Sequence, residues 1–240
     1  PVMLGAILSD SNFGVSAQRM DFRRALIAAH REVCVGHHVY HDIPLAALVE
    51  ALLERIPPAS GARRTLPPQP EYPRGLVADD APLCAGDLSR ALNDRILAHG
   101  PMNIVSDMGD CLFAAMELLP TPLVAPGYYA TMGFGVPAGI GAQVATGERS
   151  LILVGDGAFQ NESQCAALGD WRFADMANVL GGRGHRVTTR KEFKAALDAA
   201  FAERGRFQLI EFMVPPGDST PTLQRFSEGI RALRARAAAA

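Results

Sequence analysis

Apolar runs of strand length alternate with amphipathic segments along most of the chain. Short apolar runs predict strands at 103–106, 151–154 and 207–213, and a further short strand is expected at 185–187. The run Leu151–Val154 is apolar on both faces, which is typical of a central strand in a parallel sheet. This alternation of strands and helices predicts an α/β fold with a doubly wound parallel sheet.

Helix start and stop signals lie between these strands. They predict helices at 87–99 with Asp87 as the cap, at 171–180 before a Gly-Gly pair, and from a capping box formed by Thr189 and Glu192 to Glu203. The tail alternates arginine with leucine and alanine, which predicts a solvated terminal helix.

The chain divides into two pieces. The first, 1–57, opens with an apolar strand at 2–8 and contains an amphipathic helix at 45–53. Proline, arginine and small residues dominate the part from Pro57 to Pro73, which predicts an extended, exposed connection. We therefore expect a linker at 58–86, a second domain at 87–216 and a helical tail at 217–240.

The strongest chemical signal is the sequence Gly155-Asp156-Gly157-Ala158 directly after the strand 151–154. At the carboxyl end of such a strand, glycines let backbone N–H groups approach phosphate oxygens. Asp156 adds a hard oxygen ligand for Mg²⁺, which takes one or two carboxylates and fills its other positions with phosphate and water. The alternative is an ordinary tight turn in which Asp156 caps the next helix.

A second glycine-rich segment, 125–142, lies upstream and predicts a turn leading into a closely packed helix. Gly135, Gly139 and Gly141 recur where side chains would hold the backbone away from a neighbour. The spacing is not that of a dinucleotide-binding fingerprint, because no glycine follows Gly135 at the required interval and no strand immediately precedes the segment.

Together, GYYATMGFGVPAGIGA, the strand and GDGAFQ resemble the diphosphate-binding domain of thiamine diphosphate enzymes. With DMGDCLFAAMELL upstream and the sequence from Trp171 onward, the chain looks most like the 2-oxo acid decarboxylases of indolepyruvate or phenylpyruvate decarboxylase type, from Pro1 to about Arg231. The resemblance implies the thiamine diphosphate-binding fold at 87–216 and the carboxyl-terminal part of a middle domain at 1–57.

The resemblance also implies roles for particular residues. Asp156 matches the magnesium ligand, and the turn Gly155–Ala158 matches the backbone contacts to the diphosphate. Met132 matches the bulky apolar residue beneath the bend of the cofactor, which we treat as the catalytic positioning residue. Ala130, Thr131 and Met132 would contact the pyrimidine through the main chain; the alternative for Met132 is an ordinary core methionine.

The turn after the strand 103–106 is expected to face the same crevice by topology. In the resembling enzymes it touches the diphosphate end, which makes Asp107, Gly109, Asp110 and Cys111 candidate cofactor contacts. An aspartate-rich turn that satisfies its own backbone is the competing interpretation.

The chain departs from the family pattern at two places. The family continues from Gly-Asp-Gly through a helix and a strand to an Asn-Asn pair that supplies the second metal ligand, whereas Gln160 here runs directly into Asn161. We expect a segment to be missing between 160 and 161, and we assign neither Asn161 nor Asn178 to the metal. The domain with the activating glutamate and the acid and base residues is also not part of this sequence; His37, His38 and His41 are interpreted as surface residues.

Composition adds exclusions. A net charge of −2 without a basic patch argues against nucleic acid as a partner. The four cysteines form no Cys-x-x-Cys pair and are expected to be reduced thiols in a cytoplasmic protein. No apolar run reaches the roughly 20 residues that span a bilayer, and no leader-like segment opens the sequence, so we expect neither membrane insertion nor a membrane partner.

The activity implied by the resemblance is Mg²⁺-dependent, non-oxidative decarboxylation of an aromatic 2-oxo acid to an aldehyde and carbon dioxide, in a homodimer or homotetramer. Two other interpretations stay open. One is a carboligating enzyme similar to acetolactate synthase, and the other is a non-catalytic fragment that binds diphosphate weakly or only supports assembly.

Overall fold

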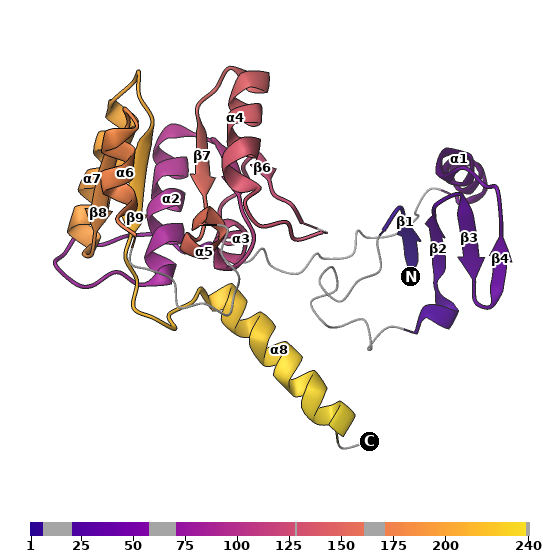
Figure 1. Cartoon of the computed structure of the whole chain (residues 1–240). Helices are drawn as coiled ribbons and strands as arrows, with labels where there is room; N and C mark the ends of the chain where they lie inside the picture. Colours follow the sequence, from indigo (N-terminus) through magenta and orange to yellow (C-terminus); the bar gives the residue numbers. More distant parts are fainter. Residues whose placement is uncertain (7–20, 58–70, 128, 161–170, 239–240) are drawn as a thin grey trace. The chain divides into compact units, whose positions relative to one another are not determined.

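The computed structural model describes residues 1–6, 21–57, 71–127, 129–160 and 171–238 (Figure 1). Its contacts divide the chain into two compact units, one formed by Pro1–Gln69 with Phe226–Ala240 and the other by Pro70–Arg225. The second unit therefore begins well before the predicted start at Asp87. Leu83, inside the predicted linker, is buried in the core of this unit, and its backbone N–H donates to the Thr188 carbonyl oxygen at 3.0 Å.

The first unit contains a small mixed sheet in the order β1-β2-β3-β4. Its strands are β1 Val2–Leu4, β2 Leu26–Ala29, β3 Glu32–Val35 and β4 His38–Tyr40. β1 runs parallel to β2, and the other pairs are antiparallel. A 3-10 helix, η2 Phe22–Arg24, precedes β2, and α1 Leu45–Arg55 confirms the helix predicted at 45–53. The strand predicted at 2–8 ends at Leu4; its last two residues lie outside the described part.

The second unit contains two parallel sheets. β5 Asn103–Ser106, β6 Leu123–Val124 and β7 Ser150–Leu153 form one in the order β6-β5-β7, and β8 Arg183–Val187 pairs with β9 Gln208–Phe212 in the other. The strands predicted from the apolar runs are confirmed. β6 was not predicted, because two apolar residues give no periodic signal.

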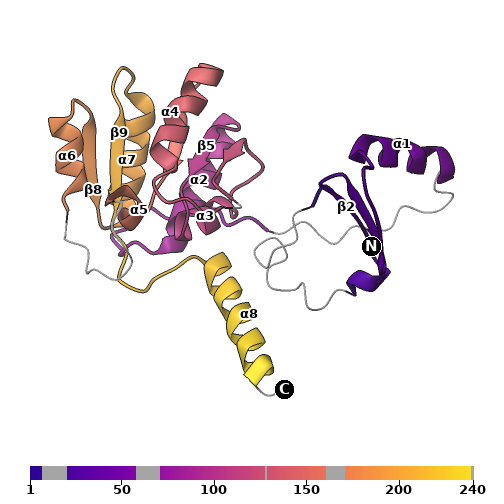
Figure 2. The same cartoon turned by 45° about the vertical axis from the view of Figure 1, so that its right-hand side comes forward.

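Helices connect and cover these strands: α2 Ala85–His99, α3 Asp110–Ala115, α4 Gly135–Thr146, α5 Asp156–Gln160, α6 Phe173–Val179 and α7 Arg190–Ala202. The last helix, α8 Pro221–Ala238, follows β9 and begins in this unit, but its residues from Phe226 onward belong to the first unit. α4 packs against β5 and β7, while α6 and α7 pack against β8 and β9 (Figures 1 and 2). The unit is therefore an α/β structure built on parallel strands. One apolar core joins both sheets, since it includes Ile104 of β5, Leu153 of β7 and Val187 of β8.

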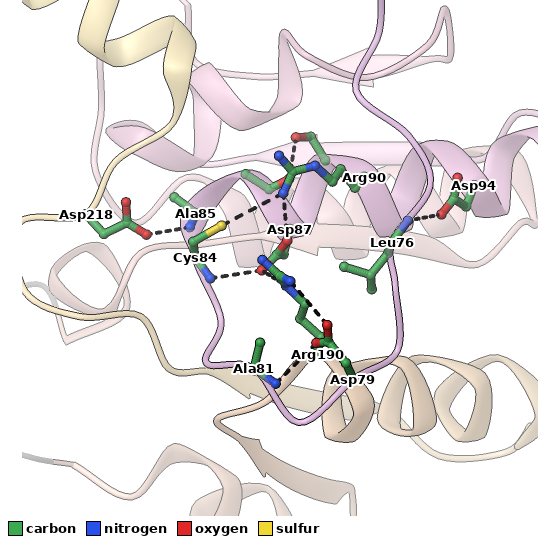
Figure 3. A network of polar contacts seen from close by, with 12 residues as sticks. Leu76, Asp79, Ala81, Cys84, Ala85, Asp87, Arg90, Asp94, Arg190 and Asp218 are labelled. Atoms are coloured by element: carbon green, nitrogen blue, oxygen red, sulfur yellow. Dashed lines mark hydrogen bonds and ion pairs between the residues drawn. The ribbon is translucent and has the colours of Figure 1, made fainter.

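The start of α2 differs from the prediction. Its N-cap is Cys84, and Asp87 occupies the third position of the helix, where its Oδ2 accepts the Cys84 N–H at 3.0 Å. The Asp87 carboxylate is fully buried and also accepts hydrogen bonds from Arg90 and Arg190 (Figure 3). Burial by itself raises the pKa of Asp87, but the bonds from Arg190, Cys84 and Arg90 outweigh it and leave the pKa below its ordinary value.

The segment before α2 is held to the unit by the same kind of contact. Asp94 accepts the N–H groups of Gly75 and Leu76 at 2.7 and 2.8 Å (Figure 3). Arg190 also faces Asp79, with 3.6 Å between Nη1 and Oδ2. These residues of the predicted linker 58–86 are therefore bonded to α2 and α7, whereas residues 58–70 lie outside the described part.

β7 and β5 differ in their surroundings. β5 has a partner on each side and all four of its residues are buried, whereas β7 pairs only with β5 among the described strands. Only Leu153 of β7 is buried. Among the described residues, β7 is therefore an edge strand and not the predicted central strand, because no described strand pairs with its outer side.

Candidate functional site

The turn after β5 is organised by Asp107, whose side chain is fully buried. Its Oδ1 accepts the Met108 N–H at 2.8 Å and the Gly133 N–H at 3.2 Å, and its Oδ2 accepts the Gly135 N–H at 2.7 Å. Asp107 thus connects the end of β5 to a loop far along the chain. No local sequence signal predicts these contacts.

The loop before α4 approaches this carboxylate because it contains glycines. A Cβ placed on Gly135 would lie 3.2 Å from Asp107 Oδ2 and 3.3 Å from Asp107 Cβ, which is tighter than an ordinary contact. Further along α4, a Cβ on Gly139 would lie 2.3 Å from Ile152 Cδ1 of β7. The predicted close packing is confirmed at these two glycines, whereas Gly141 has open space.

The turn after β7 reaches the same place. The Asp107 N–H donates to the Leu153 carbonyl oxygen at 2.8 Å, so the ends of β5 and β7 are bonded to each other. A Cβ on Gly133 would lie 3.9 Å from the Ala158 carbonyl oxygen. The structure therefore brings together three segments predicted from sequence, and both views place α3 and α5 at this end of the sheet (Figures 1 and 2).

In the turn Gly155–Ala158 after β7, Asp156 is exposed. It is the first residue of α5, and its Oδ1 accepts the Gly157 N–H at 2.8 Å. The contact agrees with the local capping alternative, yet it uses only one carboxylate oxygen. A Cβ on Gly155 would meet nothing within 4 Å, and Ala158 is buried beneath the turn.

Met132 and Ala130 lie on the exposed side of the glycine loop. The Met132 side chain is 44% exposed, so it is not a core methionine in this unit. Ala130 has a φ of 63°, a left-handed conformation that non-glycine residues rarely adopt. Such backbone strain persists where surrounding contacts enforce it, and it is often found at functional sites. Thr131 between them is also exposed.

The remaining residues of the β5 turn serve different neighbours. Gly109 has a φ of 87°, which explains why glycine precedes α3. The Asp110 carboxylate accepts both the N–H and the hydroxyl of Thr220, so it anchors the segment before α8. Burial raises the pKa of the Cys111 thiol; contacts with Ser106 and the Gly155 amide lower it less, and the Asp107 charge raises it further.

Other candidates from the sequence are placed elsewhere or lie outside the described residues. Asn178 Oδ1 accepts the Gly184 N–H at 2.9 Å and so closes a local turn, while Asn161 lies outside the described part. His37, His38 and His41 are exposed, as predicted, and His41 Nδ1 lies 2.9 Å from Glu32 Oε1. Cys34, Cys84 and Cys111 are free thiols, and Cys165 lies outside the described residues.

The donor set near β7 suits a metal that is shared with a phosphate ligand. Within the described residues, no group of three or more His, Cys, Asp and Glu side chains could hold a metal ion alone. A single exposed carboxylate beside open glycine backbone is compatible with Mg²⁺, which uses few protein carboxylates when phosphates complete its shell. No helix in the described part of the chain has the length and apolar character needed to cross a membrane.

The three turns lie within a segment that matches a known protein family. Residues 107–168 match the family described as "Thiamine pyrophosphate enzyme, C-terminal TPP binding domain". These residues contain the β5 turn, the glycine loop and the β7 turn.

Three relatives are similar to the chain. The indole-3-pyruvate decarboxylase of Azospirillum brasilense is 50% identical over 268 residues, which cover 97% of this chain and 49% of that protein. A probable 2-ketoarginine decarboxylase of Pseudomonas aeruginosa is 38% identical over 128 residues, covering 48% of this chain and 22% of that protein. An alpha-keto-acid decarboxylase of Mycobacterium tuberculosis is 25% identical over 258 residues, covering 89% of this chain and 45% of that protein.

The chain spans about half the length of the A. brasilense and M. tuberculosis relatives. The A. brasilense alignment uses 268 residues of the relative but only 97% of a 240-residue chain, so about 35 residues of the relative have no counterpart here. With its thiamine pyrophosphate-binding domain and a 50% identical relative along nearly its whole length, the chain belongs to the thiamine pyrophosphate enzymes and is related to their indole-3-pyruvate decarboxylases.

Proposed function

We propose that this chain is part of an enzyme that removes carbon dioxide from an aromatic 2-oxo acid without oxidation and releases the aldehyde. The observation that carries the proposal is the convergence of the Met132 loop with the Asp156 turn at the carboxyl ends of β5 and β7, inside the matched thiamine pyrophosphate-binding domain. The name of the A. brasilense relative supports indolepyruvate as the substrate. Phenylpyruvate is the second candidate.

The residues at these turns suit particular contacts with the cofactor. Asp156 would hold Mg²⁺ through its free carboxylate oxygen, and the backbone of Gly155, Gly157 and Ala158 would face the diphosphate. The exposed segment from Ala130 to Met132 would contact the pyrimidine, with the Met132 side chain beneath the bend between the rings. When bound, thiamine diphosphate supplies the electron sink that decarboxylation of a 2-oxo acid requires.

We also propose that a segment of about 35 residues is missing between 160 and 161, as the length of the A. brasilense alignment suggests. Three features of the second unit support this position. The outer edge of β7 has no partner among the described strands, and the parallel strands fall into two sheets. Val179 at the end of α6 and its C-cap Leu180 are 87% and 70% exposed. A strand from such a segment would pair with β7, and the same segment would supply the second metal ligand.

Helix α4 exposes apolar side chains that a second copy of the protein could cover. α4 is apolar on all sides, yet it buries only Gly135 and Gly139, while Ile140 and Val144 are 61% and 80% exposed. A helix with this composition is normally covered. We propose that a second copy of the protein covers α4 in a homodimer or homotetramer. We also propose that the substrate is a small-molecule 2-oxo acid and that the protein is located in the cytoplasm.

The test is a product assay on the full-length protein with thiamine diphosphate and Mg²⁺. We expect indolepyruvate or phenylpyruvate to yield the corresponding aldehyde and carbon dioxide, and Asp156→Ala to abolish the reaction. An acetohydroxy acid formed from pyruvate would favour the carboligating alternative. If neither product forms, a thermal shift with thiamine diphosphate and Mg²⁺ identifies a binding module, since a ligand of the folded state raises its stability.

A further inference from the structure

We propose that Asp107 is a positioning residue that orients the backbone of the Met132 loop and does not itself contact the cofactor. The inference deepens the proposed function and rests on it. Asp107 has a fully buried carboxylate that bonds two amides of a loop more than twenty positions away, Gly133 and Gly135.

The first step concerns the direction of one peptide group. The Gly133 N–H points at Asp107 Oδ1, and the described chain contains no cis peptide bond. In a planar trans peptide the N–H and the preceding C=O point in opposite directions. The Met132 carbonyl is therefore aimed away from Asp107.

The second step concerns the start of α4. Gly135 is the first residue of this helix, and its N–H donates to Asp107 Oδ2 at 2.7 Å. A negative charge at a helix N-terminus is favourable, and a carboxylate there satisfies an amide that has no partner within the helix. Asp107 thus holds the loop at two points on either side of Phe134. Ala130, just before this anchored stretch, has the left-handed φ of 63°.

The third step concerns the groups on Asp107 itself. Its carboxylate oxygens accept three N–H groups, its own N–H donates to Leu153, and its carbonyl oxygen accepts the Ser106 hydroxyl and the Cys111 thiol. A buried anion with these partners has no reason to face a diphosphate, which carries the same sign of charge. The sequence prediction that Asp107 contacts the cofactor is thereby replaced with an indirect role.

Two ligands that both contain a diphosphate can distinguish direct contact of Asp107 with the cofactor from positioning of the Met132 loop. Inorganic pyrophosphate with Mg²⁺ needs only the Asp156 turn, whereas thiamine diphosphate with Mg²⁺ also needs the Met132 loop. In Asp107→Asn the side chain keeps its size but presents an NH₂ group to one of its donors. We expect calorimetry on the full chain to show at least a roughly tenfold weaker Kd for thiamine diphosphate, with the pyrophosphate Kd unchanged within about threefold.

Asp156→Ala is the matched control and should weaken both ligands together. Gly135→Ala is the second variant, because its Cβ would press on Asp107 Oδ2 at 3.2 Å; it should produce the same selective loss at smaller size, even if Asp107→Asn does not fold. Amide exchange should show Gly133 and Gly135 protected in the ligand-free protein and faster in the variants. This measurement needs no added ligand.

The outcomes are distinct. An equal loss of pyrophosphate and thiamine diphosphate in Asp107→Asn would mean direct contact or general disruption, and an unchanged Kd for both would mean that Asp107 has no role; either result overturns the inference while leaving the proposed function intact. A wild-type protein that binds neither ligand would overturn the proposed function and the inference with it.

Discussion

The turns after β5 and β7 begin alike and end differently. Each turn follows a parallel strand and carries an aspartate near a glycine: Asp107 lies two residues before Gly109, and Asp156 lies between two glycines. The two strand ends are joined by the hydrogen bond from the Asp107 N–H to the Leu153 carbonyl oxygen. Asp107 is buried with both oxygens bonded, whereas Asp156 is exposed with one oxygen bonded locally. The same residue type at the same topological position thus supports the backbone in one turn and is open to a ligand in the other.

The difference follows from the groups that surround each carboxylate. β5 has neighbours on both sides, so polar groups at its end are cut off from water and must find partners within the protein. Among the described residues Asp156 accepts only the adjacent Gly157 N–H, and its side chain stays exposed. Accessibility of the second turn is what a metal and a diphosphate require.

Covering the outer edge of β7 should have the largest effect on this comparison. We expect insertion of the matching segment of the A. brasilense relative between Gln160 and Asn161 to stabilise the protein by about 5 kcal/mol, the amount for burying two or three large apolar side chains. The midpoint of thermal unfolding should rise by roughly 10–20 °C. A scrambled insert of equal length is the control; an equal rise with it would contradict the proposal that β7 lacks a specific strand.

Removing the Asp107 carboxylate should lower the free energy of unfolding much more than removing the Asp156 carboxylate. Asp107→Ala leaves three amides without their acceptor, and we expect it to lower the free energy of unfolding of the ligand-free protein by about 3 kcal/mol, because each unsatisfied buried amide costs about 1–3 kcal/mol. Asp156→Ala, at an exposed position, should stay within about 0.5 kcal/mol. Urea unfolding of both variants measures the contrast, and similar losses would remove it.

The gain in stability that ligand brings should depend more on Asp156 than on Asp107. Thiamine diphosphate with Mg²⁺ at a hundredfold excess over its Kd should stabilise the wild-type protein by about 2.7 kcal/mol. Asp156→Ala should lose this gain, and removing Mg²⁺ with a chelator should have the same effect on the wild type. Retention of the full gain in Asp156→Ala, measured by thermal shift, would show that the metal is held elsewhere.

The smallest expected effect concerns the packing of α4 on β7. Gly139→Ala places a Cβ 2.3 Å from Ile152 Cδ1 and should destabilise the protein by about 1–3 kcal/mol through overpacking. Gly141→Ala on the same helix has open space and should stabilise it by about 0.5–1 kcal/mol through helix propensity. A double-mutant cycle with Ile152→Ala should show positive coupling with Gly139→Ala; additivity would contradict the contact.

Much of the second unit could be predicted from the sequence because its signals are local. The capping box at Thr189 and Glu192 opens α7 as expected, since both halves of the signal lie within one helical turn. The strands β5 and β9, which were predicted from short apolar runs, are confirmed for the same reason. At α2, the predicted cap lies three positions too late, because Asp87 is the third residue of the helix and forms a capping box with Cys84, whose N–H it accepts.

By itself, the sequence determined the alternation of strands and helices, the glycine-rich turns and the aspartate between two glycines after β7, because each depends on neighbours a few residues apart. Only the tertiary structure decided that Asp107 serves the backbone, that Asp110 anchors Thr220, and that β7 lies at an edge. These outcomes depend on burial and on hydrogen-bond partners far along the chain, and burial is a property of the packed molecule that no short stretch of residues contains.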